Sequence, residues 1–435
     1  MRIADLGRSV DLAAAGREMH QLIEELYPLC RSITGAGLRA TLDRIAQDVP
    51  LGRHEVPTGT RVLDWTVPRE WSIRDAWVKN ARGERVIDFL RSNLHVVQYS
   101  VPVHRRMSLA ELRPHLHTLP ERPGWIPYRT SYYEERWGFC LEHARLAELP
   151  EGEYEVCIDS TLTEGSLSYG ECVLRGETAD EVLLSCHVCH PSLCNDNLSG
   201  IALCTQLARH LGPCARRYTY RFLFAPGTIG ALAWLSRNEA GLTAIRHGLV
   251  VACVGDPGTP HYKRSRRGAD VDRAVELVLR HTGGPYEVRP FSPYGYDERQ
   301  YCSPGFDLPV GSLTRTPHGE FPEYHTSADD PSLVTAEALG ASLGLYLEVL
   351  AVLEEDRRYR GTNPKGEPQL GRRGLYGALG GLPHRRQAEM AMLWVLNLAD
   401  GRHSLLDVAE RAGLDFRTVH EAATLLREHG LLEAA

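Results

Sequence analysis

The sequence predicts an α/β protein whose core is a mixed, mostly parallel sheet with helices on both faces. From Glu153 onward, short apolar runs that end in glycine, proline or polar residues alternate with helical patterns, as in EVLLSCHV followed by LSGIALCTQLARHL. Strands that alternate with helices are typical of a parallel sheet covered by helices. Ligands of such sheets bind at the carboxyl ends of the strands, so the residues that follow each apolar run are the first candidates for function.

Other parts of the chain have different patterns. EMHQLIEELYPLC and LRATLDRIAQDV, separated by a turn at SITGAG, have the apolar spacing of two helices. From Arg61 to about Leu146, short β-prone runs at close spacing predict a small inserted β-rich domain. The segment from Tyr359 to about His384 is rich in glycine, arginine and proline, and is expected to be a linker. The three helical patterns after it are typical of a winged helix. We therefore expect an α/β body over residues 1–60 and 150–360, an inserted domain over 61–149, a linker over 361–384 and a winged helix over 385–435.

Composition and charge exclude several classes of protein. The chain has 435 residues, of which 43% are apolar and 24% charged, and its net charge is −7. This balance gives no general attraction to nucleic acid or to anionic membranes. No apolar run approaches the roughly 18 residues of a spanning helix, and the N-terminal stretch lacks the basic start and apolar centre of a secretory signal. The expected location is the cytoplasm, without a membrane partner.

The 11 cysteines are odd in number and scattered, which indicates free thiols in a reducing compartment. Cys186, Cys189 and Cys194 flank the candidate site described next. With His190 they could form a structural zinc site, and Cys189 could be a nucleophile. A closed zinc site draws its ligands from separated pairs, whereas these residues lie in one short stretch. We rank both the structural zinc site and the cysteine nucleophile below a catalytic metal site.

The strongest functional pattern is SCHVCHPSLCNDNLSG, Ser185–Gly200. An apolar strand delivers His187 at its end, and a polar loop with Asp196 leads into a helix. Imidazole and carboxylate ligands suit a zinc ion that activates water. His190 is either a further ligand or an outer partner.

Two later strand ends add candidates. LVVACVGDPG presents Asp256, and FPEYHTSADD contains Glu323 and His325. If Glu323 to His325 is extended, the two side chains point to the same side, because strand side chains alternate. We expect zinc, one ion or two, held by His187, Asp196 and His325, with Asp256 as the next candidate.

The order of these motifs resembles that of zinc aminopeptidases of the bacterial leucyl aminopeptidase type, which hold one or two zinc ions at the C-terminal edge of a mixed sheet. The resemblance implies that Asp196 bridges two metal positions, that His187 and Asp256 belong to one of them, and that His325 belongs to the other. A further resemblance covers nearly the whole chain, to a bacterial family of aminopeptidase-like proteins with a small inserted domain and a C-terminal winged helix. Its members are often linked to polysaccharide or natural-product biosynthesis. The motifs that carry it are LYPLCRSITG, VPREWSIRDAWV, SNLHVVQYSVPV, TSYYEERWGFC, GSLSYGE, YDERQYCSPG and EYHTS.

One segment departs from the aminopeptidase pattern. Where those enzymes have two adjacent glutamates, a general base and a metal ligand, RFLFAPGTIG has Gly227 and Thr228. Gly227 has no side chain to accept a proton, and Thr228 is a poor zinc ligand. Glu323, or failing that Glu298, is expected to take the proton instead.

Substrate contacts are expected nearby. Asp297 could hold a free amine, and Arg299 or Arg315 could hold a carboxylate or carbonyl oxygen. The alternative is an ordinary network of ion pairs around a loop.

The sequence therefore predicts a zinc-dependent aminopeptidase-like hydrolase of an amide or peptide bond near a free amine, with a small peptide or aminoacyl amide as substrate. The alternatives are a zinc-containing binding protein without turnover and a winged-helix regulator with a peptidase-like body. The last helical pattern, DFRTVHEAATLLREHG, mixes acidic with basic residues, which is poor for phosphate contacts. We expect docking or dimerisation, including a homo-oligomer, rather than DNA binding.

Overall fold

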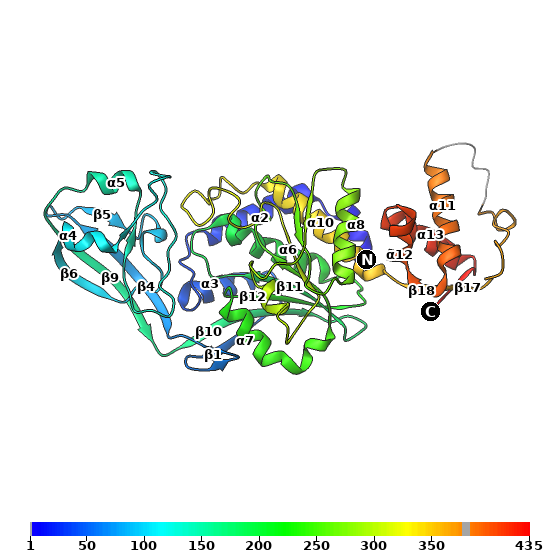
Figure 1. Cartoon of the computed structure of the whole chain (residues 1–435), viewed down its shortest axis with the longest axis horizontal. Helices are drawn as coiled ribbons and strands as arrows, with labels where there is room; N and C mark the ends of the chain where they lie inside the picture. The colour runs from blue at the N-terminus through cyan, green and yellow to red at the C-terminus, as the bar shows by residue number, and fades with distance from the viewer. Residues whose placement is uncertain (1, 376–382) are drawn as a thin grey trace. The chain divides into compact units, whose positions relative to one another are not determined.

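The computed structural model describes residues 2–375 and 383–435, and the chain folds as two compact units. One unit comprises Val10–Gly268 and Glu287–Leu343. The other comprises the N-terminal residues through Ser9, Ala269–Tyr286 and Gly344–Ala435. The elements of both are labelled in Figure 1.

The first unit contains the predicted mixed sheet, which is confirmed. Its order is β1-β10-β12-β11-β13-β16-β14-β15. The central strands β12, β11, β13 and β16 are parallel, and β10 and β14 run antiparallel to their central neighbours. The strands are β1 (Leu51–Pro57), β10 (Ser166–Leu174), β11 (Glu181–His187), β12 (Thr219–Ala225), β13 (Ile245–Val251), β14 (His261–Lys263), β15 (Glu287–Arg289) and β16 (Val310–Thr314).

The central strands end at one edge of this sheet because helices carry the chain back between them. α6 (Ser199–Leu211) links β11 to β12, and α7 (Ile229–Asn238) leads from β12 towards β13. The chain steps in opposite directions in these two connections, so right-handed crossovers place the helices on opposite faces of the sheet. Every residue of β11 is buried, which fits a strand covered on both faces.

The two predicted N-terminal helices are present. They are α2 (Leu12–Leu26) and α3 (Ala36–Ile45). α2 begins at Asp11, whose side chain accepts a hydrogen bond from the Ala14 N–H, and its apolar face packs against α6. The loop between the two helices contains the buried Arg31, whose Nε donates a hydrogen bond to the His190 carbonyl at 2.8 Å.

The inserted domain is β-rich, but it extends further along the chain than expected. Its sheet has the order β5-β4-β9-β6, with β4 (Glu70–Lys79), β5 (Arg85–Asp88), β6 (Val103–Ser108) and β9 (Glu153–Thr163). The expected boundary at residue 149 left β9 in the α/β body, whereas β9 pairs along its length with β4 and β6. The smaller elements are β2 (Arg61–Val62), β3 (Trp65–Thr66), α4 (Leu109–Leu112), β7 (Leu116–His117), β8 (Phe139–Cys140) and α5 (His143–Glu148).

The second unit contains the winged helix. Its helices are α11 (Pro383–Leu398), α12 (Leu405–Ala412) and α13 (Phe416–Glu428), and its sheet has the order β18-β17-β19. The strands are β17 (Arg358–Gly361), β18 (Asp400–Ser404) and β19 (Leu432–Ala434). β17 precedes the expected linker, so the module starts earlier in the chain than residue 385. Residues 376–382 of that linker lie outside the described residues.

Three further helices contribute to this unit: α1 (Ile3–Ser9), α8 (Asp270–His281) and the C-terminal part of α10 (Ala336–Glu355). α10 is the one described helix long and apolar enough to cross a membrane. In the fold, 61% of its most apolar window is buried, as is typical of a core helix in a globular protein.

A buried carboxyl in this unit makes its stability depend on pH. Asp356 accepts a hydrogen bond from the Leu406 N–H at 2.8 Å, and burial raises its pKa to about 6. The folded state therefore holds this proton more tightly than the unfolded state, and stability is lost as the pH rises from about 4 through 6. We expect Asp356→Asn to become more stable than the wild type by on the order of 3 kcal/mol across this window. Thermal unfolding of both proteins between pH 4 and 8 checks this, and a pH-independent difference between them would contradict it.

Candidate metal centre and active site

Three histidines surround one buried carboxylate at the carboxyl edge of the sheet. His187, the last residue of β11, places its Nε2 atom 2.8 Å from Asp196 Oδ1. His325 Nε2 lies 3.0 Å and His190 Nδ1 3.6 Å from Asp196 Oδ2. The structure thus brings together three of the predicted metal ligands, and adds His190, which the sequence left open.

This group fits a divalent cation. Ligand atoms of His187, His190 and Asp196 all lie within 4.8 Å of one another. His190 Nδ1 is buried without a hydrogen-bond partner, although buried polar atoms normally have one. Burial lowers the pKa of His190 to about 3, so its ring is neutral, as a metal ligand must be. Burial by itself would raise the pKa of Asp196, but the surrounding histidines hold it well below its usual range. Three imidazoles and one carboxylate form a donor set that suits zinc.

Asp196 is held in place by a second carboxylate, that of Asp329. Asp329 Oδ1 accepts hydrogen bonds from the N–H groups of Cys194 and Asn195, and Oδ2 accepts one from the Asp196 N–H. Burial raises the pKa of Asp329 to about 8. The sequence analysis missed this residue, because nothing in the Asp329–Asp330 pair marks one of the two as the anchor of a loop far away in the chain.

Asp256 does not join the histidines. Its carboxylate accepts hydrogen bonds from the Asn195 side chain (3.0 Å), the Gly258 N–H (2.7 Å) and both the hydroxyl and N–H of Thr316. Asn195 in turn accepts a hydrogen bond from the Gly255 N–H. The structure therefore places Asp256 behind the loop that carries Asp196, where it ties that loop to the end of β13.

Tyrosine rings enclose the histidines. Tyr296 stacks on His187 with ring centroids 4.9 Å apart and donates a hydrogen bond to Asp196 Oδ1 at 3.0 Å. Tyr324 stacks on His325 at 3.9 Å. These aromatic contacts fix the planes of two of the three imidazoles.

The inserted domain completes the site. Tyr128 meets His190 and His325 edge-on, with ring centroids 5.2 and 5.0 Å apart, and its N–H donates to the His325 carbonyl at 2.8 Å. A bridge between Pro127 and Thr326 continues this contact. The proline-rich segment of the inserted domain is therefore a wall of the site.

The expectation that Glu323 and His325 lie on one side of an extended segment is wrong. The Tyr324 N–H donates to the Phe321 carbonyl and the Thr326 N–H to that of Glu323, so the segment is a turn. His325 has φ 56°, in the left-handed region. Glu323 is half-buried, and its side chain forms no hydrogen bond or ion pair with the described residues.

Asp297 contacts the loop that follows β12. It is 5% exposed, and Oδ1 accepts a hydrogen bond from the Thr228 N–H at 2.8 Å. Burial raises its pKa to about 6, and the charge of His187 is the strongest opposing influence. A Cβ atom on Gly227 would lie 3.3 Å from Cys189 Sγ and 3.6 Å from His187 Cβ, so the backbone at Gly227 passes close to both residues.

The remaining polar candidates have different surroundings. Glu298 is buried, and its Oε1 pairs with Lys263 Nζ at 2.7 Å, while Oε2 is buried without a partner. Arg299 Nη2 reaches the Thr228 hydroxyl at 3.4 Å. Arg315 follows β16, and its N–H donates to the Cys253 carbonyl. Of these candidate residues, Glu298 is the one that forms an ion pair among the described residues, whereas the nearby Glu320 pairs with Arg289.

The cysteines of this region are free and buried. Burial raises the pKa of Cys189 to about 12, and that of Cys186 well above its usual value. A reactive cysteine or a metal-bound cysteine requires the thiolate. The thiols here are protonated near neutral pH, which disfavours the nucleophile, and the ligand atoms that converge among the described residues are those of His187, His190 and Asp196 rather than of a cysteine.

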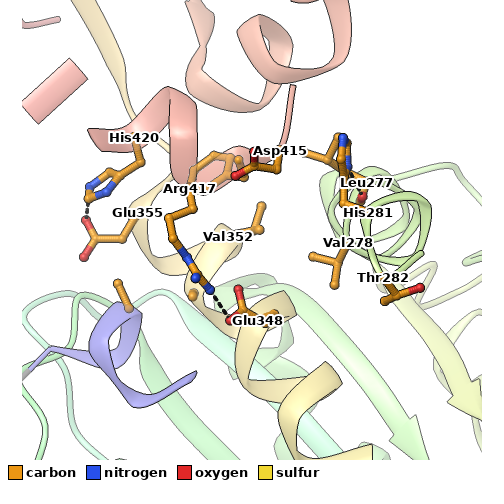
Figure 2. Close-up of a pocket in the computed structure, with 13 residues that line it drawn as sticks. Leu277, Val278, His281, Thr282, Glu348, Val352, Glu355, Asp415, Arg417 and His420 are labelled. Atoms are coloured by element: carbon orange, nitrogen blue, oxygen red, sulfur yellow. Dashed lines mark hydrogen bonds and ion pairs between the residues drawn. The ribbon is translucent and has the colours of Figure 1, made fainter. Parts of the chain in front are cut away.

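The second unit contains a cavity of about 300 Å³ beside the last helix of the winged helix (Figure 2). α13 uses its polar side chains there: Arg417 pairs with Glu348 of α10, and His420 Nε2 lies 3.3 Å from Glu355 Oε2. Glu421 pairs with Arg8 of α1 at 2.7 Å. In a DNA-binding winged helix the corresponding helix reads bases, whereas here three of its polar residues contact the same protein unit.

Comparisons with known proteins agree with these observations. A family model described as a domain of unknown function (DUF4910) matches residues 20–356, and a winged helix-turn-helix model matches residues 357–434. A Clostridium acetobutylicum protein, provisionally described as a polysaccharide biosynthesis protein with an aminopeptidase-like domain, is 53% identical over 419 residues, or 96% of each chain.

Solved structures extend the comparison. A crystal structure from C. acetobutylicum, provisionally described as a peptidase, has 51% identity and a TM-score of 0.94 over 98% of each chain. BSAP, a zinc aminopeptidase from Bacillus subtilis, has 10% identity and a TM-score of 0.57 over 78% of this chain and 95% of its own. A peptidase M28 precursor from Shewanella amazonensis has 13% identity and a TM-score of 0.56 over 81% and 95%. At these low identities the last two show a shared fold.

Proposed function

Since the chain belongs to the family of the domain of unknown function DUF4910, here followed by a winged helix-turn-helix, we propose that it is a zinc-dependent hydrolase of an amide or peptide bond close to a free amine. The observation that carries this proposal is the group of His187, His190 and His325 around Asp196, at the edge of the sheet where ligands of α/β proteins bind. The fold shared with zinc aminopeptidases supports it.

These four residues would hold one zinc ion. Zinc supplies Lewis-acid chemistry: it polarises a carbonyl group and makes water more acidic. Asp329 fixes the Asp196 loop by three backbone hydrogen bonds, and Tyr296 fixes Asp196 and His187 together. Such outer contacts set the orientation and basicity of metal ligands.

Asp297 is our proposal for the proton acceptor. The turn at Glu323 argues against Glu323, and Glu298 already pairs with Lys263. Asp297 is a buried carboxylate whose pKa is raised by burial and lowered by the charge of His187. The net raised pKa suits a group that takes and returns a proton near neutral pH. It would take a proton from water as the water oxygen bonds to the carbonyl carbon, and give it to the nitrogen as the C–N bond breaks.

The biological setting is a proposal as well. The description of the C. acetobutylicum relative supports a role in a biosynthetic pathway. The contacts of α13 support a winged helix that docks on protein rather than reading DNA.

One experiment tests the hydrolase. Purified protein is assayed with a panel of aminoacyl amides and dipeptides, before and after chelation and again after zinc is restored. Turnover that is lost and regained with zinc is expected. Zinc binding without turnover of any member would favour the binding-protein alternative instead. Salt-dependent binding to duplex DNA would favour the regulator.

Tyr128 connects the inserted domain to this chemistry. Tyr128→Ala removes the ring that packs against His190 and His325, so we expect zinc affinity to fall by about 10- to 100-fold, as for other outer contacts of metal ligands. Competition with a chromophoric chelator measures this. The matched control is Tyr133→Ala, since Tyr133 is 50% exposed and does not contact the histidines. Equal zinc affinity in the two variants would show that the inserted domain does not support the ligands.

A further inference from the structure

Two arginines at the carboxyl edge of the sheet lack carboxylate partners. Among the described residues, neither Arg299 nor Arg315 forms an ion pair, whereas most other arginines near carboxylates do. The Nε atom of each is buried and has no hydrogen-bond partner. For Arg299 the structure shows one weak bond, from Nη2 to the Thr228 hydroxyl at 3.4 Å. A guanidinium group has five N–H donors, so most of the donors of both residues have no acceptor in the protein.

The two residues flank the candidate metal centre. The relevant strands lie in the order β12-β11-β13-β16, and all of them run parallel. His187 ends β11, Arg315 follows β16, and Arg299 reaches Thr228, just beyond β12. Adjacent strands are about 4.8 Å apart, so the outer two of these four are separated by about 14 Å. A small substrate that spans this edge can reach both guanidinium groups.

Neighbouring carboxylates do not satisfy these donors. Burial lowers the pKa of Arg315, and Asp256 is the charge that opposes this effect. Yet both oxygens of Asp256 already accept hydrogen bonds from Asn195, Gly258 and Thr316. Unsatisfied buried donors destabilise a protein, and such groups usually have a ligand or a functional reason.

We infer that Arg315 and Arg299 form an anion-binding subsite of the active site, in which each guanidinium group can hold an acidic group of the substrate, a carboxylate or a phosphate. Both anions match the planar fork of a guanidinium group. The inference deepens the proposed function: it rests on the metal centre being the reactive site, and it narrows the substrate to an anionic aminoacyl amide or peptide.

Binding of two simple anions tests the subsite without turnover. Glutarate and inorganic phosphate are titrated by calorimetry into zinc-loaded and chelator-treated protein, so that binding to the metal itself is separated from binding to the arginines. We expect the metal-free protein to bind one of the two, and the anion that binds identifies the source of the acidic group.

Arg315→Gln should weaken this binding by about 10- to 100-fold and Arg299→Gln by less. The control is Arg246→Gln, because Arg246 pairs with Asp180 at the amino end of β13. Equal affinities in Arg315→Gln and Arg246→Gln would overturn the inference. If Arg315→Gln does not fold, Arg315→Lys replaces it, because lysine keeps the positive charge and loses the planar guanidinium group.

Turnover separates this inference from the proposed function. The wild type is assayed with Ala-Glu and with its doubly amidated analogue, and we expect KM to be about 10-fold or more lower for the acidic substrate, with the difference lost in Arg315→Gln. If both substrates are hydrolysed with equal KM, the subsite is wrong and the hydrolase stands. If neither is hydrolysed while an anion binds in an Arg315-dependent way, the hydrolase is wrong and the subsite stands.

Discussion

Asp196→Asn is expected to abolish zinc binding and, with it, amide hydrolysis. Asp196 is the one residue whose carboxylate lies within reach of all three histidines, and it is held ionised by them. Asparagine keeps the shape but loses the charge and one acceptor oxygen. Structural zinc sites bind with apparent free energies of about 10 to 16 kcal/mol, so the loss of one ligand of four is expected to weaken binding on the order of 100-fold or more.

Metal analysis of the purified proteins measures this directly. About one zinc per chain is expected in the wild type, little in Asp196→Asn and little in His187→Ala. Asp256→Asn is the informative comparison, because the sequence suggested Asp256 as a ligand whereas the structure places it behind the loop. We expect this variant to retain zinc, although with a less stable loop. Two zinc ions in the wild type, one of which is lost in Asp256→Asn, would mean that Asp256 turns toward the metals and that the second site is real.

The sequence was most informative about the candidate site residues that follow the ends of strands. His187 and Asp196 could be placed because a short apolar run, a polar loop and a helix follow one another within Ser185–Gly200. Parallel strands bring such ends to one edge, so the late His325 could be joined to them across more than a hundred residues. The mixed sheet could be predicted for the same reason, since the alternation of elements in the α/β part is regular.

The sequence was less informative where a position depends on contacts far away in the chain. His325 lies on a turn because the inserted domain pairs with the residues around it, as the bridge between Pro127 and Thr326 shows. The local pattern FPEYHTS contains no sign of that partner. β9 has the alternating burial of an antiparallel strand with one buried face, and such a pattern does not reveal which of two sheets it will join. Asp329 and Tyr296 lie far from Asp196 in the chain, and only the folded structure brings them into contact with it.

Asp297→Asn is expected to lower kcat by about 100- to 10,000-fold while zinc is retained, the usual range for loss of a general acid–base group. The substitution keeps an oxygen that can accept the Thr228 N–H, so the loop after β12 and the start of α9 (Glu298–Tyr301) should be undisturbed. What is lost is the ability to hold a proton. Since the Asp297 carboxyl must be ionised to accept it, wild-type kcat/KM should fall as the pH drops through about 6, and this acid limb should be absent from the residual activity of the variant.

Glu323→Gln is the decisive control, because the two residues represent competing assignments of the same role. Glu323 is half-buried on a turn and has no side-chain partner among the described residues, so its substitution should change kcat by no more than about 2-fold. If instead Glu323→Gln loses activity and Asp297→Asn keeps it, the turn around His325 must rearrange when substrate binds, and the proton acceptor belongs to that turn. If both variants keep zinc and full activity, neither carboxylate takes the proton. Only the first pattern, loss in Asp297→Asn alone, agrees with Asp297 as the proton acceptor of this site.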